Sequence, residues 1–125
     1  MGNTGVKRNM PAVALRGMAI LPHTIIHFDL SRKKSIAAVE QAMVESQRIF
    51  LVAQKETDAE EPGFEDVYPM GTIALVKQVI KMPNHIVRVM VEGILRGELL
   101  RFTDNDAYLE GEVEEIEEDL NLHGT

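Results

Sequence analysis

Two histidines are the first residues whose spacing suggests metal chemistry. His23 and His27 stand four positions apart, and on a helix both imidazoles could bind one zinc ion. Pro22 and the β-branched residues Ile25 and Ile26 favour extended chain instead, in which four residues span roughly 13 Å. Two ligands that each bind one ion at about 2 Å cannot lie that far apart. We therefore predict no metal site.

No pattern typical of nucleophilic or nucleotide chemistry occurs in the sequence. The phosphate-binding patterns G-x-x-x-x-G-K-[ST] and G-x-G-x-x-G are missing, as is the G-x-S-x-G turn of many serine hydrolases. The chain has no cysteine, which removes thiol nucleophiles, disulfides and thiolate metal sites. Its acidic segments do not match the calcium loop of EF-hands. We predict no catalytic residue and no cofactor in this chain.

The formal net charge of -7 is unevenly distributed. Residues 56–66 contain six acids and residues 110–119 contain seven, in both cases without a base, so these two segments hold 13 of the 20 acids. The rest of the chain has 7 acids against 13 lysines and arginines, a formal charge of +6. We interpret the acidic segments as a solvated loop and a solvated strand face on a basic body.

Two groups of side chains are candidates for binding. Arg32, Lys33 and Lys34 put three positive charges in the first turn of a predicted helix, where the macrodipole favours acids by roughly 0.3 to 1 kcal/mol each. Such a locally unfavourable arrangement can mark a functional surface, or the long side chains simply extend into water. Met82 adjoins Pro83 at a predicted hairpin tip, where exposing a flexible apolar side chain is costly unless something binds it.

One helix is predicted, from about residue 32 to residue 46. Ser31 is the expected N-cap. The apolar positions Ile36, Val39 and Met43 follow the spacing i, i+3, i+7 and predict a face that packs on a sheet.

Extended structure dominates the rest of the chain. Alternating or apolar patterns predict an edge strand at 10–16 and further strands at 26–30, 48–54, 72–82, 85–91, 94–102 and 108–114. The strand at 48–54 is apolar enough to be covered on both faces, and residues 64–68 suit a single helical turn. The order of these elements excludes βαβ winding and favours an α+β, mostly β fold, in which a curled, mostly antiparallel sheet packs against the helix.

The segment 86–97 predicts how the sheet curls. It alternates up to Val91, is interrupted at Gly93 and resumes as strand, so that Gly93 and Gly97 would let it bend. Asn84 suits the tight turn before it, because asparagine tolerates the left-handed conformation.

At 125 residues the chain is expected to form one domain. No apolar run approaches the roughly 18 residues of a membrane span, and no signal peptide is recognisable. We expect a flexible leader at 1–8, a domain at 9–118, a tail at 119–125 and a cytoplasmic location.

Three stretches, in this order and spacing, resemble a known family. They are Leu15-Arg16 followed by Leu21-Pro22-His23, then residues 50–56, then residues 89–96. Together they are similar to the N-terminal domain of the bacterial Lon ATP-dependent protease, and residues 32–36 and 71–74 also match that pattern. The resemblance covers residues 10 to 119. Its hairpin turn, 83–85, lacks the glycine common at that turn in the family.

The resemblance implies a PUA-like pseudo-barrel of about six to seven strands with one main helix, and a role in substrate recognition and assembly. In the family this domain precedes a helical region, an AAA+ motor that uses ATP and magnesium, and a Ser-Lys protease domain, and the whole enzyme forms a homo-hexamer. We expect this chain itself to hydrolyse neither ATP nor peptide bonds.

The resulting hypothesis is capture of unfolded or damaged proteins through their exposed apolar segments. Candidate contacts are the connector Leu21 and Pro22 and the tip Met82 and Pro83, with residues 32–34 steering acidic segments. Weak self-association through exposed sheet edges is expected, and several copies in a ring would add avidity.

Two alternatives stay open. The basic body, and the use of PUA-like barrels in RNA recognition, would suit nucleic-acid binding, although the four phenylalanines and two tyrosines are too scattered to form a stacking platform. The chain could also be a stand-alone domain protein without a motor.

Overall fold

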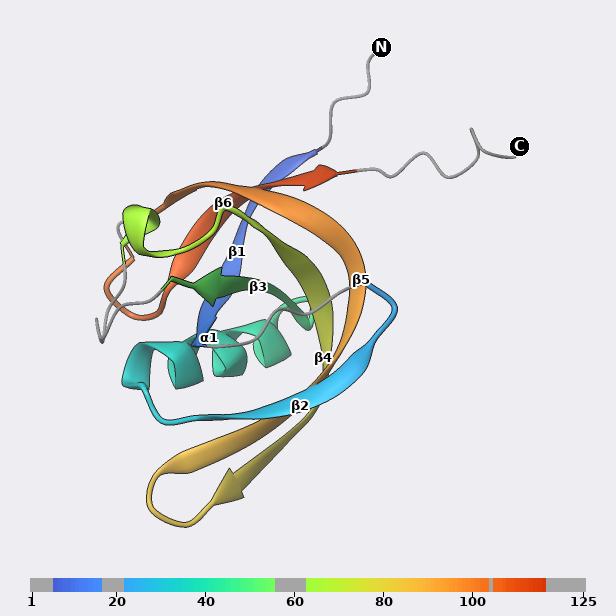
Figure 1. Ribbon diagram of the computed structural model, residues 1–125. Coiled ribbons are helices and arrows are strands. Elements are labelled where there is room, and N and C mark those ends of the chain that lie inside the picture. Colours follow the sequence, from blue (N-terminus) through green and yellow to red (C-terminus); the bar gives the residue numbers. More distant parts are fainter. Residues whose placement is uncertain (1–5, 17–21, 56–62, 104, 117–125) are drawn as a thin grey trace.

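Six strands and one α-helix form the domain in the computed structural model, which describes residues 6–16, 22–55, 63–103 and 105–116 (Figure 1). Two predicted strands, 85–91 and 94–102, are one continuous strand, which is why six are found where about seven were expected. The elements in chain order are β1 (Lys7–Arg16), β2 (Ile25–Leu30), α1 (Lys33–Val44), β3 (Arg48–Gln54), the 3-10 turn η1 (Phe64–Asp66), β4 (Met70–Met82), β5 (Ile86–Phe102) and β6 (Glu110–Ile116).

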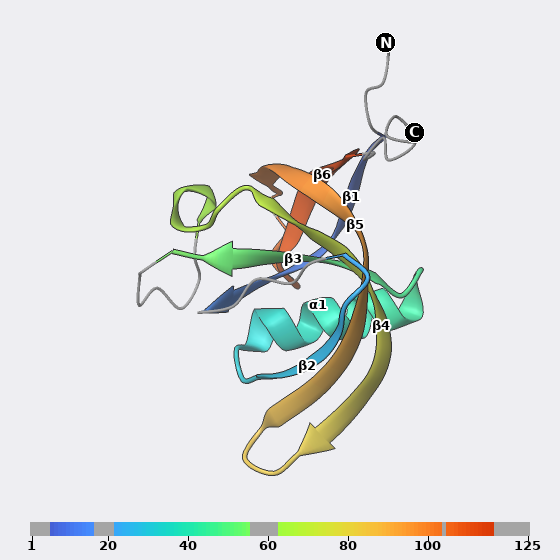
Figure 2. The same ribbon diagram turned by 45° about the vertical axis from the view of Figure 1, so that its right-hand side comes forward.

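Strand β5 closes the sheet into a barrel. The strand order is β2-β5-β4-β3-β1-β6, and β5 also pairs with β6. Its first part, 87–92, pairs with β2, whereas its later part, 96–102, pairs with β6. The predicted mostly β, curled architecture with one helix is therefore confirmed. The β4–β5 hairpin extends past α1, and its turn lies at the opposite end of the molecule from the start of β1 (Figures 1 and 2).

The prediction that the first strand lies at an edge of the sheet was wrong. β1 is not an edge strand, because residues 7–11 pair with β6 and residues 12–16 pair with β3. Pro11 stands where β1 changes partner. The pairing with β3 is parallel, so the sheet is mixed, and β2 and α1 make the crossover that the sequence pattern had excluded. Among the described strands, β2 is the one that pairs on a single side.

β1 also begins earlier than the predicted domain. Lys7 and Arg8, which we assigned to a leader, pair with Glu114 and Val113 of β6. The predicted tail at 119–125 lies outside the described residues.

The core has two parts, one on each face of the sheet. Ile49 and Leu51 of β3 pack with α1, β2 and the first part of β5, whereas Phe50 and Val52 pack inside the barrel. These alternate residues of β3 are all buried, which confirms a central strand covered on both faces. Figures 1 and 2 show α1 lying between β3 and β2.

The helix is shifted and rotated relative to the prediction. Arg32, not Ser31, is the N-cap, without a side-chain capping bond, and the helix ends at Val44. Its buried residues are Ser35, Ala38, Val39 and Ala42, whereas Met43 is 39% exposed. Small side chains let the helix approach the sheet closely, and this close packing sets the buried face more strongly than the spacing of the larger apolar residues.

The bend in β5 is a β-bulge. Ile73 of β4 pairs with Leu95, and the next residue, Ala74, pairs with Gly93, so Ile94 has no partner in β4. Gly97 has a different role: a Cβ there would lie 2.8 Å from Val113 Cγ1, so its lack of a side chain permits close packing inside the barrel.

Both predicted turns are present. Asn84 has a φ of 65° in the hairpin turn, as expected, and His85 beside it also lies in the left-handed region with a φ of 61°. The helical turn predicted at 64–68 is η1, Phe64–Asp66. Of the helices in the described ranges, none has the length and apolar content needed to span a bilayer.

Candidate functional site

Two open clefts flank the first turn of α1. The first, which we call the aromatic cleft, lies between that turn and three apolar side chains, Phe64, Phe102 and Leu109, and has a volume of about 630 Å³. Phe64 is 45% exposed, and the other two are half-buried. The same cleft is lined by residues 31–35 and by Arg101. It therefore combines apolar walls with basic groups.

The second cleft, the hairpin cleft, lies between α1 and the β4–β5 hairpin and has a volume of about 700 Å³. Its apolar surface comes from Ile36 and Ala37 of the helix and from Met82, Ile86 and Val87 of the hairpin. The polar residues that line it are Ser31, Lys33, Glu40, Lys81 and His85. The helix and the hairpin tip, separate in the sequence, thus form one surface.

The three basic residues of the first turn differ in their surroundings. The Arg32 guanidinium donates a hydrogen bond of 2.8 Å from Nη2 to Oε1 of Gln54, a buried residue at the end of β3. This contact anchors the N-cap to the barrel. Lys33 is exposed and Lys34 is half-buried, and neither forms an ion pair with any residue of the described ranges.

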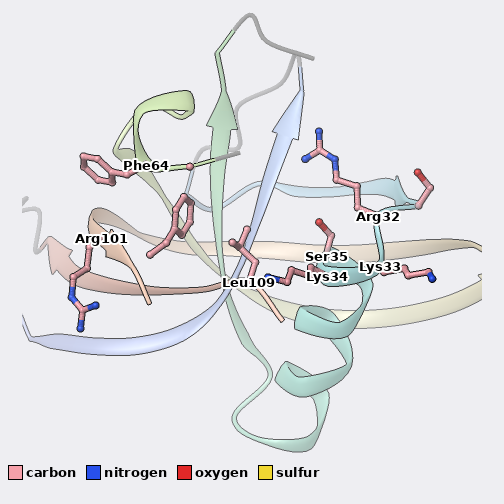
Figure 3. Close-up of a pocket in the computed structure, with 10 residues that line it drawn as sticks. Arg32, Lys33, Lys34, Ser35, Phe64, Arg101 and Leu109 are labelled. Carbon is pink, nitrogen blue, oxygen red and sulfur yellow. The ribbon is translucent and has the colours of Figure 1, made fainter. Parts of the chain in front are cut away.

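The two lysines point to different clefts. Figure 3 shows Lys34 extending toward Leu109, whereas Lys33 extends in the opposite direction, away from the Phe64 wall. On that wall Arg101 is already paired, because its Nε lies 3.0 Å from Oε1 of Glu112. Among the described residues, the lysines of the clefts without an ion-pair partner are therefore Lys33 and Lys34 on the first turn of the helix and Lys81 on the hairpin.

The structure brings together some of the predicted contact residues and separates others. Lys33 and Met82 line the hairpin cleft together. Pro83 is exposed in the turn but lines neither cleft, and half-buried Pro22, in the turn before β2, lines neither. Leu21 lies outside the described residues.

Sequence reasoning missed the apolar side chains of the aromatic cleft, and of the apolar residues of the hairpin cleft it proposed only Met82 as a contact. Phe64 was assigned only to a helical turn, although an aromatic residue beside Glu65 and Asp66 was a signal of an exposed aromatic surface. Phe102 ends β5 and Leu109 comes just before β6, and neither gave such a signal, because their joining in one cleft depends on the β5–β6 pairing.

The site offers binding groups rather than reactive ones. In the described part of the chain, no group of three metal-binding side chains comes together. His27 lies in β2, as the prediction of extended chain required, whereas His23 lies in the turn before it, with a left-handed φ of 68°. Tyr108, next to Leu109, has its pKa raised by burial and then by the negative charge of Glu110. Apolar surface beside unpaired lysines can bind a segment of polypeptide.

Comparison with known proteins places this geometry in context. The family model described as "ATP-dependent protease La (LON) substrate-binding domain" matches residues 9–123. The chain is 47% identical over 109 residues to a Lon protease of Syntrophomonas wolfei and 45% identical over 113 residues to a Lon protease of Clostridioides difficile. These matches cover 87% and 90% of the chain but 13% and 14% of the relatives, so the chain spans about one seventh of their length.

Solved structures share the fold. The N-terminal domain of a Mycobacterium avium complex Lon protease matches with a TM-score of 0.71 at 21% identity, covering 89% of this chain and 56% of that one. A Lon N-terminal domain protein from Xanthomonas campestris matches with a TM-score of 0.68 at 16% identity, covering 90% of this chain and 62% of that one.

Proposed function

This chain belongs to the family of Lon substrate-binding domains, and we propose that it captures exposed apolar segments of unfolded or damaged proteins in the cytoplasm. The captured protein is then degraded by the motor and protease domains of a full-length enzyme. The chain itself contributes binding and no chemistry. Its role depends on surface that a structured protein hides and an unfolded one exposes.

The aromatic cleft is the observation that carries this proposal. Contiguous exposed apolar groups rimmed by polar residues mark protein-interaction sites and ligand-binding grooves on soluble proteins. Phe64 is 45% exposed, and Phe102 and Leu109 lie beside it in the same cleft. Covering the exposed part of one phenylalanine contributes about 1 kcal/mol. Each contact is therefore weak and tolerant of sequence, as capture of many different proteins requires.

Weak contacts become effective when several copies act together. In a homo-hexameric ring, the second and later contacts of one unfolded chain form at a high effective concentration, which raises the overall affinity without any new contact. An isolated domain should therefore bind unfolded protein weakly and reversibly.

The test is an NMR titration of the isotope-labelled domain with a reduced and alkylated protein that cannot refold. We expect the signals of Phe64, Phe102 and Leu109 to shift together. Phe64→Ala should weaken binding severalfold, whereas Tyr68→Ala is the matched control, because Tyr68 is an exposed aromatic residue, at 54%, that lines neither cleft. Shifts confined to residues outside the two clefts would refute the site.

The same titration separates this function from nucleic-acid binding. Single-stranded RNA at physiological salt should leave the signals of the aromatic cleft in place. RNA binding that weakens steeply with added salt, together with no response to unfolded protein, would favour the other class of function.

A further inference from the structure

The two clefts adjoin at the first turn of α1, and this arrangement suggests which order of side chains a bound segment should have. Ser31 and Lys33 line both clefts, so the two apolar surfaces adjoin at that turn. We infer that the domain prefers extended segments in which an acidic side chain lies between two apolar side chains. This inference rests on the proposed function and specifies its substrate class.

The apolar side chains of such a segment have separate places to bind. One would enter the aromatic cleft against Phe64 and Leu109, and the other would enter the hairpin cleft against Ile36 and Met82. Methionine is unbranched and adapts its shape to different apolar partners, so the hairpin cleft suits side chains of several sizes. Neither cleft demands one particular residue.

The acidic residue between them is selected by charge. The first turn of α1 contains no acid. It carries Lys33 and Lys34, which have no ion-pair partner in the described ranges, and the helix dipole adds positive potential at the same place. A carboxylate that crosses this turn would be attracted, whereas a lysine or arginine would be repelled. The turn therefore discriminates between segments of equal apolar content.

Lys33 is the residue on which the preference depends most. It lines both clefts and is exposed, so it can pair with a carboxylate that crosses from one cleft to the other. Arg32 is less available, because it is hydrogen-bonded to Gln54. An exposed ion pair of this kind corresponds to an affinity change of about two- to fivefold.

Three fluorescent peptides of equal length test the inference by anisotropy with the intact chain. They share two apolar side chains and differ only in the central residue, which is Asp, Asn or Lys. The set of three is repeated with several spacings between the central residue and the apolar side chains. We expect the Asp peptide to bind about two- to fivefold more tightly than the Asn peptide, and the Lys peptide to bind most weakly. The difference should shrink as salt rises from 0.05 to about 0.5 M, because exposed charges are screened.

Variants of Lys33 identify the responsible charge. Lys33→Gln should reduce the preference for the Asp peptide over the Asn peptide while leaving binding of the Asn peptide unchanged, and Lys33→Glu should reduce the preference further. Lys7→Gln is the matched control, because Lys7 is an exposed lysine of β1 that lines neither cleft, and it should preserve the preference.

The outcomes separate this inference from the function on which it rests. Equal binding of the three peptides, or a preference that is undiminished in Lys33→Gln, would overturn the inference and leave capture of apolar segments intact. If none of the peptides binds while unfolded protein still shifts the NMR signal of Phe64, the inference is overturned and the proposed function stands. If neither the peptides nor unfolded protein bind, the proposed function and the inference are both overturned.

Discussion

Arg88 of β5 binds Asp29 of β2 through two hydrogen bonds, from Nε to Oδ1 at 2.8 Å and from Nη2 to Oδ2 at 3.1 Å. The two residues face each other across the antiparallel pair. In the described sheet, β2 is held through β5 alone, so this bidentate ion pair braces the strand that has one neighbour.

Acid is expected to weaken this brace. The hydrogen bond from Arg88 lowers the pKa of Asp29 below its ordinary value of 3.8. Because the folded-state pKa is the lower one, the pair stabilises the fold above that ordinary value, and this contribution is lost as pH falls through the folded-state pKa. Arg88→Gln should raise the pKa of Asp29, measured by NMR titration of side-chain carboxyls. Arg101→Gln, which breaks the exposed ion pair of Arg101 with Glu112, should leave the pKa of Asp29 unchanged. If the pKa of Asp29 is the same in the original chain and in both variants, Arg88 is not the cause of its lowering.

Alanine in place of glycine should destabilise the barrel in a graded order. A Cβ on Gly71 would collide with the backbone oxygen of Leu51, which cannot move aside, whereas a Cβ on Gly97 would meet side-chain atoms at 2.8 Å or more. Overpacking of this kind typically costs about 1 to 3 kcal/mol. Gly71→Ala should therefore lower the free energy of unfolding in urea more than Gly97→Ala.

Gly63→Ala is the control for that series, because its Cβ would meet only carboxylate oxygens of Glu65 and Asp66, at 3.7 and 3.9 Å. Its effect should stay within about 0.5 kcal/mol. A Gly97→Ala domain as stable as Gly63→Ala would show that the barrel interior is looser than these contacts indicate.

Two phenylalanines should separate stability from binding. Phe50 is fully buried inside the barrel, so Phe50→Ala should cost about 3 to 5 kcal/mol in the free energy of unfolding. Phe64→Ala should change stability by about 0.5 kcal/mol or less yet weaken binding of unfolded protein, because Phe64 lines the aromatic cleft. A large loss of stability in Phe64→Ala would mean that its side chain serves the fold.

Arg32 and Lys33 are adjacent in the sequence, yet their removal should have opposite effects on stability. Arg32→Ala deletes the hydrogen bond to buried Gln54 and should destabilise the domain by about 1 to 2 kcal/mol. Lys33→Gln removes a positive charge at a helix N-terminus and should be neutral or stabilising by up to about 1 kcal/mol. Urea unfolding of both variants at low salt measures the contrast; a destabilised Lys33→Gln would indicate a structural contact for that lysine.

Local features of the fold follow from the sequence alone. The run from Ile49 to Ala53 is apolar at every position, which predicted burial on both faces, and Asn84 predicted the left-handed turn of the hairpin. The ordered motifs predicted the family. These features are accessible because they depend on the periodicity of neighbouring residues or on the order of short segments along the chain.

Only the tertiary structure decided which elements became neighbours. The parallel pairing of β1 with β3, the closure of β5 on β6 and the buried face at Ser35 and Ala38 depend on which surfaces approach one another most closely, and a local pattern does not record that. The same holds for the clefts, since Lys33 and Met82 line one cleft only because the hairpin extends past the helix. The sequence therefore determined the elements and the family, and long-range packing determined the binding surface.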